Sequence, residues 1–235
     1  MSNPIKAWSF SRLSIFEQCA FRAKLAYVDK IPEPERPLPK GKTEHANDRG
    51  SRIHDAAEAY VRGNALMTDE LHNFDAEFRK LNELFKQGRV QLEGEWAVDQ
   101  SWEPTAWRSS DTWGRIKLDA LVTLTPDHAV VIDYKTGRKY GNEVSHAKQG
   151  QLYQLATFLR YPELQTIDVE FWYLDQDEIT TTRYTRKQGE RFFKYFDQQA
   201  RAMTEAVEFP PKPNMYSCRW CPYGPKGTGD CKVGV

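Results

Sequence analysis

Apolar positions along the chain follow two periodicities, one of about 3.6 residues and one of two. Helical spacing recurs in five segments, at residues 9–28, 51–63, 74–88, 144–161 and 187–207. Alternating or continuous apolar runs predict five strands, at residues 90–98, 112–124, 128–136, 167–175 and 178–185. Ser11 is the expected N-cap of the first helix. This order predicts an α/β (mixed α+β) fold with one central mixed sheet flanked by helices.

Two segments lack either periodicity. The first, at residues 29–50, is rich in proline and charge and predicts an exposed loop. The second, at 209–235, predicts an irregular tail. Since no linker divides the chain convincingly, we predict a single domain over residues 1–235 with its core at about 50–205.

Composition narrows the class of protein. The 235 residues are 40% apolar with a mean hydropathy of -0.72, and no apolar run approaches the roughly 18–20 residues of a membrane span. The start of the chain lacks the apolar core of a signal peptide, so we expect a cytoplasmic protein with no membrane partner. The net charge of zero argues mildly against a nucleic-acid binder. From Arg183 onward, however, basic residues outnumber acidic ones by ten to five.

The stretch VVIDYKTGRKY, residues 130–140, ends an apolar strand with opposite charges. Asp133 and Lys135 point to the same face of a strand, while Tyr134 points to the other. Such a pair can hold a divalent metal and orient a water beside it, or it can be a strand-terminal salt bridge. The motif alone does not separate these two interpretations.

The preceding strand strengthens the first interpretation. Asp119 stands among apolar residues, and the short turn at residues 125–128 places it nearly opposite Asp133. Two adjacent carboxylates repel each other unless a cation lies between them, and hard oxygen ligands suit Mg²⁺ or Mn²⁺. His54, on the helix at 51–63, is either a further ligand or an ordinary surface or half-buried histidine. Gln149 and Tyr153 share one helical face and could either touch a substrate or pack.

Four cysteines are placed unevenly, with one near the start and three in the last 18 residues: Cys19, Cys218, Cys221 and Cys231. In a cytosolic chain this set indicates metal or cluster ligands before disulfides. Four thiolates suit tetrahedral Zn²⁺ or a [4Fe–4S] cluster. The spacing of the cysteines is compatible with both metal groups. On the spacing alone, zinc is the first choice.

Aromatic and basic residues lie near the proposed site. Trp102, Trp107 and Trp113 are in or beside one loop, where they could stack unpaired bases beside arginine or cap the core. Arg138 and Lys139 follow the acid–base motif and are candidates for DNA phosphate contacts.

Four short motifs occur in a fixed order: Gly50 with His54, Gly114 with Asp119, Asp133 with Lys135, and Gln149 with Tyr153. Together with the cysteines at both ends, they resemble the RecB-like branch of the PD-(D/E)XK nuclease superfamily, over essentially the whole chain. The resemblance implies a restriction-endonuclease-like core. It also implies a metal-dependent DNA exonuclease acting on single-stranded or end-accessible DNA.

The resemblance also implies residue roles. The metal would be coordinated by three side chains and one main-chain carbonyl: His54, Asp119, Asp133 and that of Tyr134. The catalytic residues would be Asp119, Asp133 and Lys135, of which Lys135 would position the attacking water. Gln149 and Tyr153 would contact DNA or support the site. An additional acid would come from Glu93 or Glu95, between which the sequence does not choose.

For the cysteines, the resemblance favours a [4Fe–4S] cluster over zinc. Related nucleases tie their chain ends together in this way, here at residues 11–30 and 209–235, although the nine residues between Cys221 and Cys231 exceed the usual gap. Partners would include proteins of recombination or CRISPR adaptation, in a prokaryotic cell or encoded by a phage. The alternative is a nucleic-acid-binding subunit with a Cys₄ zinc or iron–sulfur site that is inactive, or active only in a larger complex.

Overall fold

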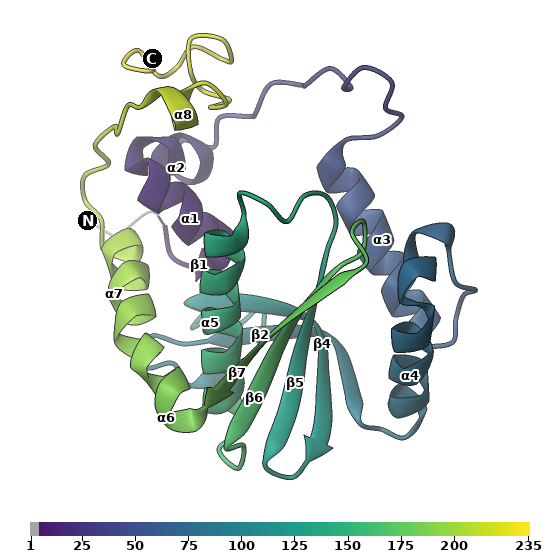
Figure 1. Cartoon of the computed structure of the whole chain (residues 1–235). Coiled ribbons are helices and arrows are strands. Elements are labelled where there is room, and N and C mark those ends of the chain that lie inside the picture. The colour runs from purple at the N-terminus through teal and green to yellow at the C-terminus, as the bar shows by residue number, and fades with distance from the viewer. Residues whose placement is uncertain (1–4) are drawn as a thin grey trace.

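The centre of the molecule is a seven-stranded mixed sheet (Figure 1). This computed structural model describes residues 5–235. The strands are β1 (Trp8–Ser9), β2 (Val90–Val98), β3 (Pro104–Thr105), β4 (Gly114–Thr125), β5 (His128–Lys135), β6 (Thr166–Tyr173) and β7 (Glu178–Thr185). The sheet order is β3-β2-β4-β5-β6-β7, with β1 beside β4. β1 with β4 and β5 with β6 pair in parallel, and the other neighbours are antiparallel, which confirms the predicted mixed sheet.

Helices cover both faces of the sheet (Figure 1). On one face lie α1 (Phe10–Gln18), α5 (Glu143–Arg160) and α7 (Phe193–Thr204), and on the other α3 (Ala46–Val61) and α4 (Asp75–Lys86). The shorter helices are α2 (Ala20–Tyr27), α6 (Arg186–Gly189) and α8 (Met215–Cys218), with 3-10 turns at Asp69–Phe74 and Glu190–Phe192. In the described part of the chain, no helix combines the length and apolarity that crossing a membrane requires.

Each face of the sheet has its own apolar core. Leu118, Leu152 and Phe158 belong to the core beneath α5, and Ile53 and Phe78 belong to the core beneath α3 and α4. The parallel pairing of β5 with β6 needs a crossover, which α5 supplies. The motifs on β5 and α5 that the sequence singled out are thus consecutive in the sequence and adjacent in the fold.

Midway along β2 and β4, the alternation of side chains between the two faces of the sheet is interrupted. Leu118 packs beneath α5, whereas Ala120, two residues later, packs beneath α3. In a regular strand, residues two apart face the same side, so the alternation breaks at Asp119. On the paired strand β2, Glu93 has a positive φ of 49°. The irregularity places these two acidic residues at the same level of the sheet.

The first predicted helix is in fact two helices. The break is at Cys19, whose backbone is extended with φ −164° and ψ 109°. Ser9, not Ser11 as predicted, caps α1, and its hydroxyl accepts a hydrogen bond from the Arg12 N–H at 3.4 Å. The extended residue turns the chain between α1 and α2, which a continuous helix would not allow.

Two further helix boundaries differ from those predicted. α3 begins at Ala46, five residues before the predicted start, so the exposed loop is shorter than expected. The predicted helix at 187–207 is divided into α6, a 3-10 turn and α7. The bend lies where Gly189 packs so closely on α5 that a Cβ there would be 2.6 Å from the Phe158 ring. The tail at 209–235 is irregular as predicted, apart from α8.

Two of the three loop tryptophans cap the core. Trp102 and Trp113 are each 3% exposed and pack around Trp8, with ring centroids 5.2 and 5.7 Å from it. Their burial rules out the base-stacking interpretation for these two residues. Trp107 is half-buried and stays at the surface.

An ion network joins three strands away from the predicted site. Asp168 on β6 accepts two hydrogen bonds from Arg183 on β7, at 2.7 and 2.8 Å, and one from His128 on β5 at 2.9 Å. The carboxylate is buried, and the hydrogen bond from Arg183 is the main cause that lowers the pKa of Asp168 below its usual value. The network fixes the edge of the sheet.

Candidate active site

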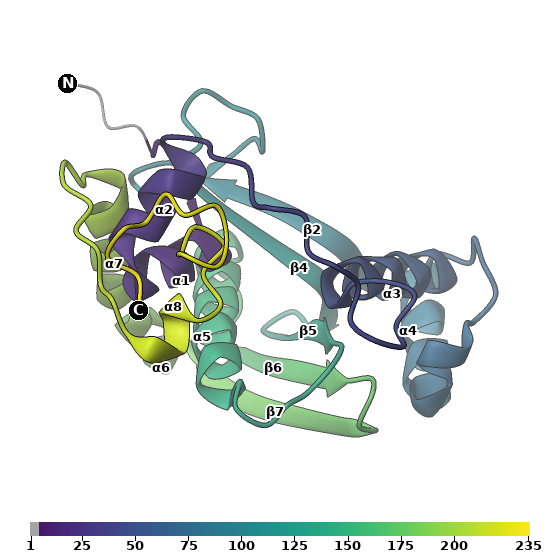
Figure 2. The ribbon, with the colours of Figure 1, turned by 90° about the horizontal axis from the view of Figure 1, so that it is seen from above.

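A cleft of about 1100 Å³ is lined by residues of α3, β4, β5 and α5. Seen from above, β4 and β5 lie between α3 and α5 (Figure 2). Six side chains singled out in the sequence line the cleft: His54, Asp119, Asp133, Lys135, Gln149 and Tyr153. They come from four elements, since α3 supplies the histidine, β4 and β5 the acids and lysine, and α5 the last two. The segment between α2 and α3 passes over this side of the molecule and adds Pro39 and Lys42 to the wall.

Three potential metal ligands converge at the cleft, and two of them, His54 and Asp119, line it. His54, Glu93 and Asp119 each offer a ligand atom, and these atoms lie within 4.8 Å of one another. His54 Nδ1 and Asp119 Oδ1 are 3.0 Å apart in a hydrogen bond. The sequence left Glu93 and Glu95 as equal candidates; Glu95 is exposed, and only Glu93 joins the group. A histidine and two carboxylates match the ligand preference of Mn²⁺ or Mg²⁺.

The electrostatics of the cleft favour a cation. Burial disfavours the charged form of His54, but the hydrogen bond that the imidazole donates to Asp119 and the charges of the nearby carboxylates outweigh it and raise the pKa of the imidazole. Burial also raises the pKa values of Glu93 and Asp133, against the lowering effect of their lysine partners. Clustered carboxylates with raised pKa values bind a divalent ion well because the ion offsets both burial and mutual repulsion.

The two strands hold the aspartates by different contacts. The β4–β5 register pairs Ala120 with Ile132, and one residue further it brings Asp119 beside Asp133, as predicted. Asp119 Oδ2 accepts a hydrogen bond of 2.6 Å from the backbone N–H of Tyr134. Asp119 therefore receives one bond from β5 and one from α3. The predicted role of the Tyr134 carbonyl stays a prediction.

Asp133 and Lys135 form a buried pair that continues into α5. Lys135 Nζ lies 2.6 Å from Asp133 Oδ2 and donates a hydrogen bond of 2.8 Å to Gln149 Oε1. Gln149 Nε2 in turn donates to the Tyr153 hydroxyl at 2.5 Å. Asp133 is 3% exposed and does not belong to the three-ligand group. The helix α5 thus fixes the position of the lysine ammonium.

One contact that closes the cleft has no local signal in the sequence. Arg49 on α3 donates two hydrogen bonds to Asp175, at 2.9 and 2.7 Å, although the residues are 126 positions apart. The N–H of Gly137 donates to the same carboxylate at 2.7 Å. Asp175 therefore ties α3 to the loop after β5. Gly50 permits the close approach, since a Cβ there would lie 3.3 Å from Thr136 Oγ1.

The basic residues after β5 lie outside the cleft lining. Arg138 is exposed, whereas the Lys139 ammonium is paired with Glu178 and lies 5.5 Å from the Tyr173 ring centre. Tyr140 is 78% exposed on the same loop. Of the two predicted phosphate contacts, only Lys139 forms such an ion pair within residues 5–235.

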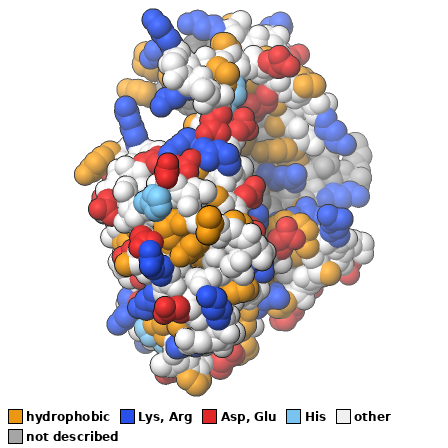
Figure 3. Space-filling model, turned by 90° about the vertical axis from the view of Figure 1, so that its right-hand side faces the viewer, with side chains coloured by type: hydrophobic (Ala, Val, Ile, Leu, Met, Phe, Trp, Pro, Cys, Tyr) orange, Lys and Arg blue, Asp and Glu red, His pale blue; other side chains and the backbone are white. Residues whose placement is uncertain are grey.

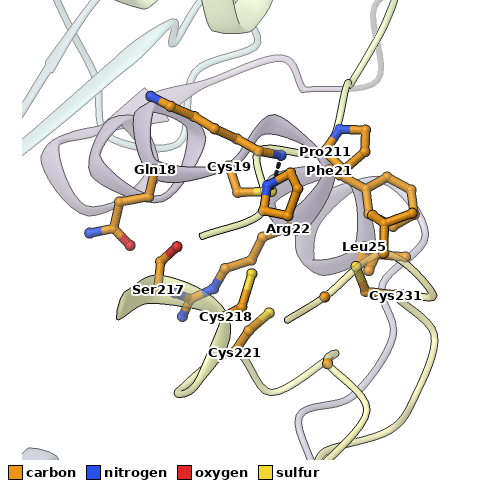
Figure 4. Close-up of a pocket in the computed structure, with 15 residues that line it drawn as sticks. Gln18, Cys19, Phe21, Arg22, Leu25, Pro211, Ser217, Cys218, Cys221 and Cys231 are labelled. Atoms are coloured by element: carbon orange, nitrogen blue, oxygen red, sulfur yellow. Dashed lines mark hydrogen bonds between the residues drawn. The ribbon is translucent and has the colours of Figure 1, made fainter. Parts of the chain in front are cut away.

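The four cysteines line a separate pocket, the cysteine pocket, between α1, α2 and the tail (Figure 4). Cys19 comes from the break between the two helices, and the other three come from α8 and the tail. Backbone N–H groups of Lys212 and Asn214 donate to the sulfurs of Cys19 and Cys218, each at 3.4 Å. The tail is also anchored by Tyr223, whose hydroxyl donates to the Ile31 carbonyl at 3.1 Å.

Comparison with known proteins identifies the class of this fold and site. The PD-(D/E)XK nuclease superfamily matches residues 7–225, so the chain belongs to this superfamily. The mixed sheet flanked by helices is the restriction-endonuclease-like fold of these nucleases, as predicted. The family makes the chain a nuclease, with DNA as the indicated substrate and divalent metal as the cofactor that its acidic site could hold.

Solved structures show similar folds. A proposed exonuclease from Eubacterium rectale is 14% identical, with a TM-score of 0.50, and the alignment covers 98% of this chain and 94% of that one. An alkaline exonuclease from Laribacter hongkongensis is 13% identical, with a TM-score of 0.35 and coverage of 86% and 88%. At 14% identity, the likeness to the Eubacterium rectale structure concerns the fold alone. No curated protein matches the chain.

Proposed function

We propose that this protein is a divalent-metal-dependent DNA exonuclease that hydrolyses phosphodiester bonds of single-stranded or end-accessible DNA. The observation that carries the proposal is the convergence in one cleft of a three-ligand group with a buried aspartate–lysine pair. The superfamily supplies the reaction class. The preference for free ends rests on the sequence resemblance, and we also propose that residues 1–235 act as a single domain.

The ligand set fits a divalent ion, with His54, Glu93 and Asp119 as proposed ligands and Asp133 beside them. When bound, the ion would polarise the phosphoryl group and lower the pKa of a water. Lys135 would hold that water and stabilise the charge that develops on the phosphate. Its ammonium is oriented for this by Gln149, so one lysine conformation is maintained before substrate arrives.

The magnitude required explains why several groups must act together. Uncatalysed phosphodiester hydrolysis is so slow that a nuclease lowers its barrier by roughly 20 kcal/mol. Positioning a water and substrate supplies about 7–11 kcal/mol at best. Electrostatic stabilisation by the cation and the fixed ammonium must provide much of the rest. Removal of Lys135 alone should therefore abolish measurable turnover while leaving metal and DNA binding largely in place.

The test uses DNA labelled at the 5′ or 3′ end, single- and double-stranded, incubated with Mg²⁺, Mn²⁺ or EDTA. Lys135→Ala is the inactive variant, and Lys148→Ala is the control, since Lys148 lies on α5 and pairs with Glu17 at the surface. Metal-dependent loss of label in the wild type and control, but not in Lys135→Ala, supports the proposal and gives the polarity. Binding without cleavage under all conditions would instead favour the nucleic-acid-binding subunit.

We further propose that the four cysteines hold a [4Fe–4S] cluster that ties the tail to the first two helices. The donor set is four thiolates around one pocket, with N–H groups directed at two sulfurs. Four thiolates would also suit one Zn²⁺ ion, so the preference for the cluster rests on the sequence resemblance.

Metal analysis of anaerobically purified protein tests the cluster. We expect about four iron atoms per chain, a brown colour, and loss of both in Cys19→Ser. One zinc per chain without iron would contradict the cluster and restore the zinc alternative. The cluster would be structural, so its removal should loosen the tail before it affects the cleft.

A further inference from the structure

A second cavity of about 390 Å³ adjoins the catalytic cleft. Lys117, Gln149 and Tyr153 line both spaces, so the two cavities share a wall formed by β4 and α5. The second cavity extends from this wall toward the start of α1 and the loop before β4. Its volume lies in the range of small-molecule sites, and it has room for about one nucleotide.

The second cavity is lined by cations and by no acid. Its charged lining residues are Arg12, Arg115 and Lys117, and no Asp or Glu among residues 5–235 lines it. The catalytic cleft, by contrast, contains several carboxylates. The face formed by α3 and α4 carries acidic and basic side chains interspersed (Figure 3). A net positive cavity beside an acidic metal site is suited to an anionic group of the same substrate.

The two guanidinium groups retain free donors. Arg12 Nη1 donates to the Ala7 carbonyl at 2.9 Å, and Arg115 Nε donates to the Trp107 carbonyl at 3.2 Å. Neither arginine forms a salt bridge with a carboxylate in the part of the chain that the structure describes. Each guanidinium has five N–H donors, so most of them stay available for phosphate oxygens. Lys117, which is paired with Glu93, is less available.

Trp107 adds a surface for a base. Unlike Trp102 and Trp113, it is only half-buried, and it lines the second cavity. The Arg115 guanidinium lies 5.6 Å from the centre of its ring, so the two side chains together form a stacking surface. Bases stack on such surfaces without regard to sequence. A base held there is unpaired, because a cavity with room for about one nucleotide cannot also hold its paired partner.

We propose that the second cavity binds a nucleotide of a single DNA strand whose neighbouring phosphodiester lies in the catalytic cleft. The phosphate of this nucleotide contacts Arg115 and Arg12, and its base stacks on Trp107. The inference rests on the proposed nuclease function and adds to it: the substrate is single-stranded at the position next to the cleaved bond. Gln149 and Tyr153, between the two cavities, then contact the strand as it passes.

Binding of fluorescently labelled single-stranded DNA in EDTA, where metal-dependent cleavage is absent, tests the phosphate contact. The variants are Arg115→Gln and, as a matched control, Arg108→Gln, an exposed arginine of the same loop that lines neither cavity. The slope of log affinity against log salt should decrease by about 0.7 in Arg115→Gln and stay unchanged in the control. Equal slopes in the two variants would overturn the phosphate contact. Should Arg115→Gln melt far below the wild type, Arg12→Gln replaces it.

A series of oligonucleotides, each with one abasic position, tests the base contact. Trp107→Ala should weaken binding about 5- to 100-fold, and Trp107→Phe should restore it. The loss should vanish for one abasic position only, the one whose base would occupy the cavity. A loss that is independent of the abasic position, or no loss, would overturn the stacking.

The proposed function and this inference fail separately. Wild-type protein that neither binds nor cleaves DNA with metal would refute the nuclease function. Wild-type protein that cleaves DNA, while the cavity variants behave like Arg108→Gln, would refute only the second site.

Discussion

The pair of Asp133 and Lys135 gives a sharp test of the site because both partners are buried. The Asp133 side chain is 5% exposed and the Lys135 side chain 18%, with 2.6 Å between the charged atoms. Lys135→Met keeps the length of the side chain and removes the ammonium. The aspartate then has to stay charged without its partner or take up a proton.

Two estimates bound the effect on the free energy of unfolding. Removal of one partner of a buried ion pair costs about 3–5 kcal/mol. Protonation sets a ceiling, since an aspartate with an ordinary pKa of about 3.9 takes a proton at pH 7 for about 4 kcal/mol. We therefore expect Lys135→Met to lower the stability by about 3–4 kcal/mol without metal. The double variant with Asp133→Asn should recover most of this loss, because no buried charge remains unpaired.

Urea denaturation in EDTA at pH 7 measures these values, with nuclease assays in parallel. The control is Lys148→Met, whose partner Glu17 and own side chain are 31% and 40% exposed, and which should lose less than about 1 kcal/mol. Both Lys135 variants should be inactive. If Lys135→Met is as stable as the control, or if the double variant is no more stable than the single one, the reasoning about the buried pair is wrong.

Three further outcomes are expected. Mn²⁺ at about one hundred times its dissociation constant should stabilise the wild type by about 2.7 kcal/mol in thermal melts. This stabilisation should decrease in Glu93→Gln and persist in Glu95→Gln. Equal stabilisation of the two variants would show that Glu93 is not a ligand. Asp168→Asn should lose about 1–3 kcal/mol at neutral pH. Because the pKa of Asp168 is lowered in the folded protein, its contribution is complete at neutral pH and disappears as the pH falls through that lowered value, so the two proteins should converge in acid denaturation series. Gly114→Ala should lower the melting temperature, by the equivalent of about 1–3 kcal/mol, because its Cβ would lie 2.7 Å from a buried indole; an unchanged melting temperature would show that the indole can move.

Local patterns were sufficient for the strands and for much of the site. Five strands were predicted within two residues of their observed ends, because period-two alternation reflects the two faces of a sheet directly. The short turn before His128 fixed the register of β4 and β5, and with it the meeting of Asp119 and Asp133. Helical spacing likewise placed Gln149 and Tyr153 on one face of α5, where they are hydrogen-bonded.

Helix breaks were less accessible from the sequence. The apolar spacing continues across Cys19 and across Gly189, although the backbone bends at both. Each bend lies where the chain contacts a partner distant in sequence, the tail at Cys19 and α5 at Gly189. Intrinsic helix propensity does not contain this information.

The sequence by itself determined the class of fold, the order of the elements and six side chains that line one cleft: His54, Asp119, Asp133, Lys135, Gln149 and Tyr153. The tertiary structure decided the rest. Glu93 joins the site and Glu95 does not because β2 and β4 change faces together, a non-local irregularity that alternation cannot predict. The sequence also did not separate Trp107, which stays at the surface beside Arg115, from Trp102 and Trp113, which are buried. Which side of a strand meets water depends on what packs over it, and distant segments of the chain supply that layer.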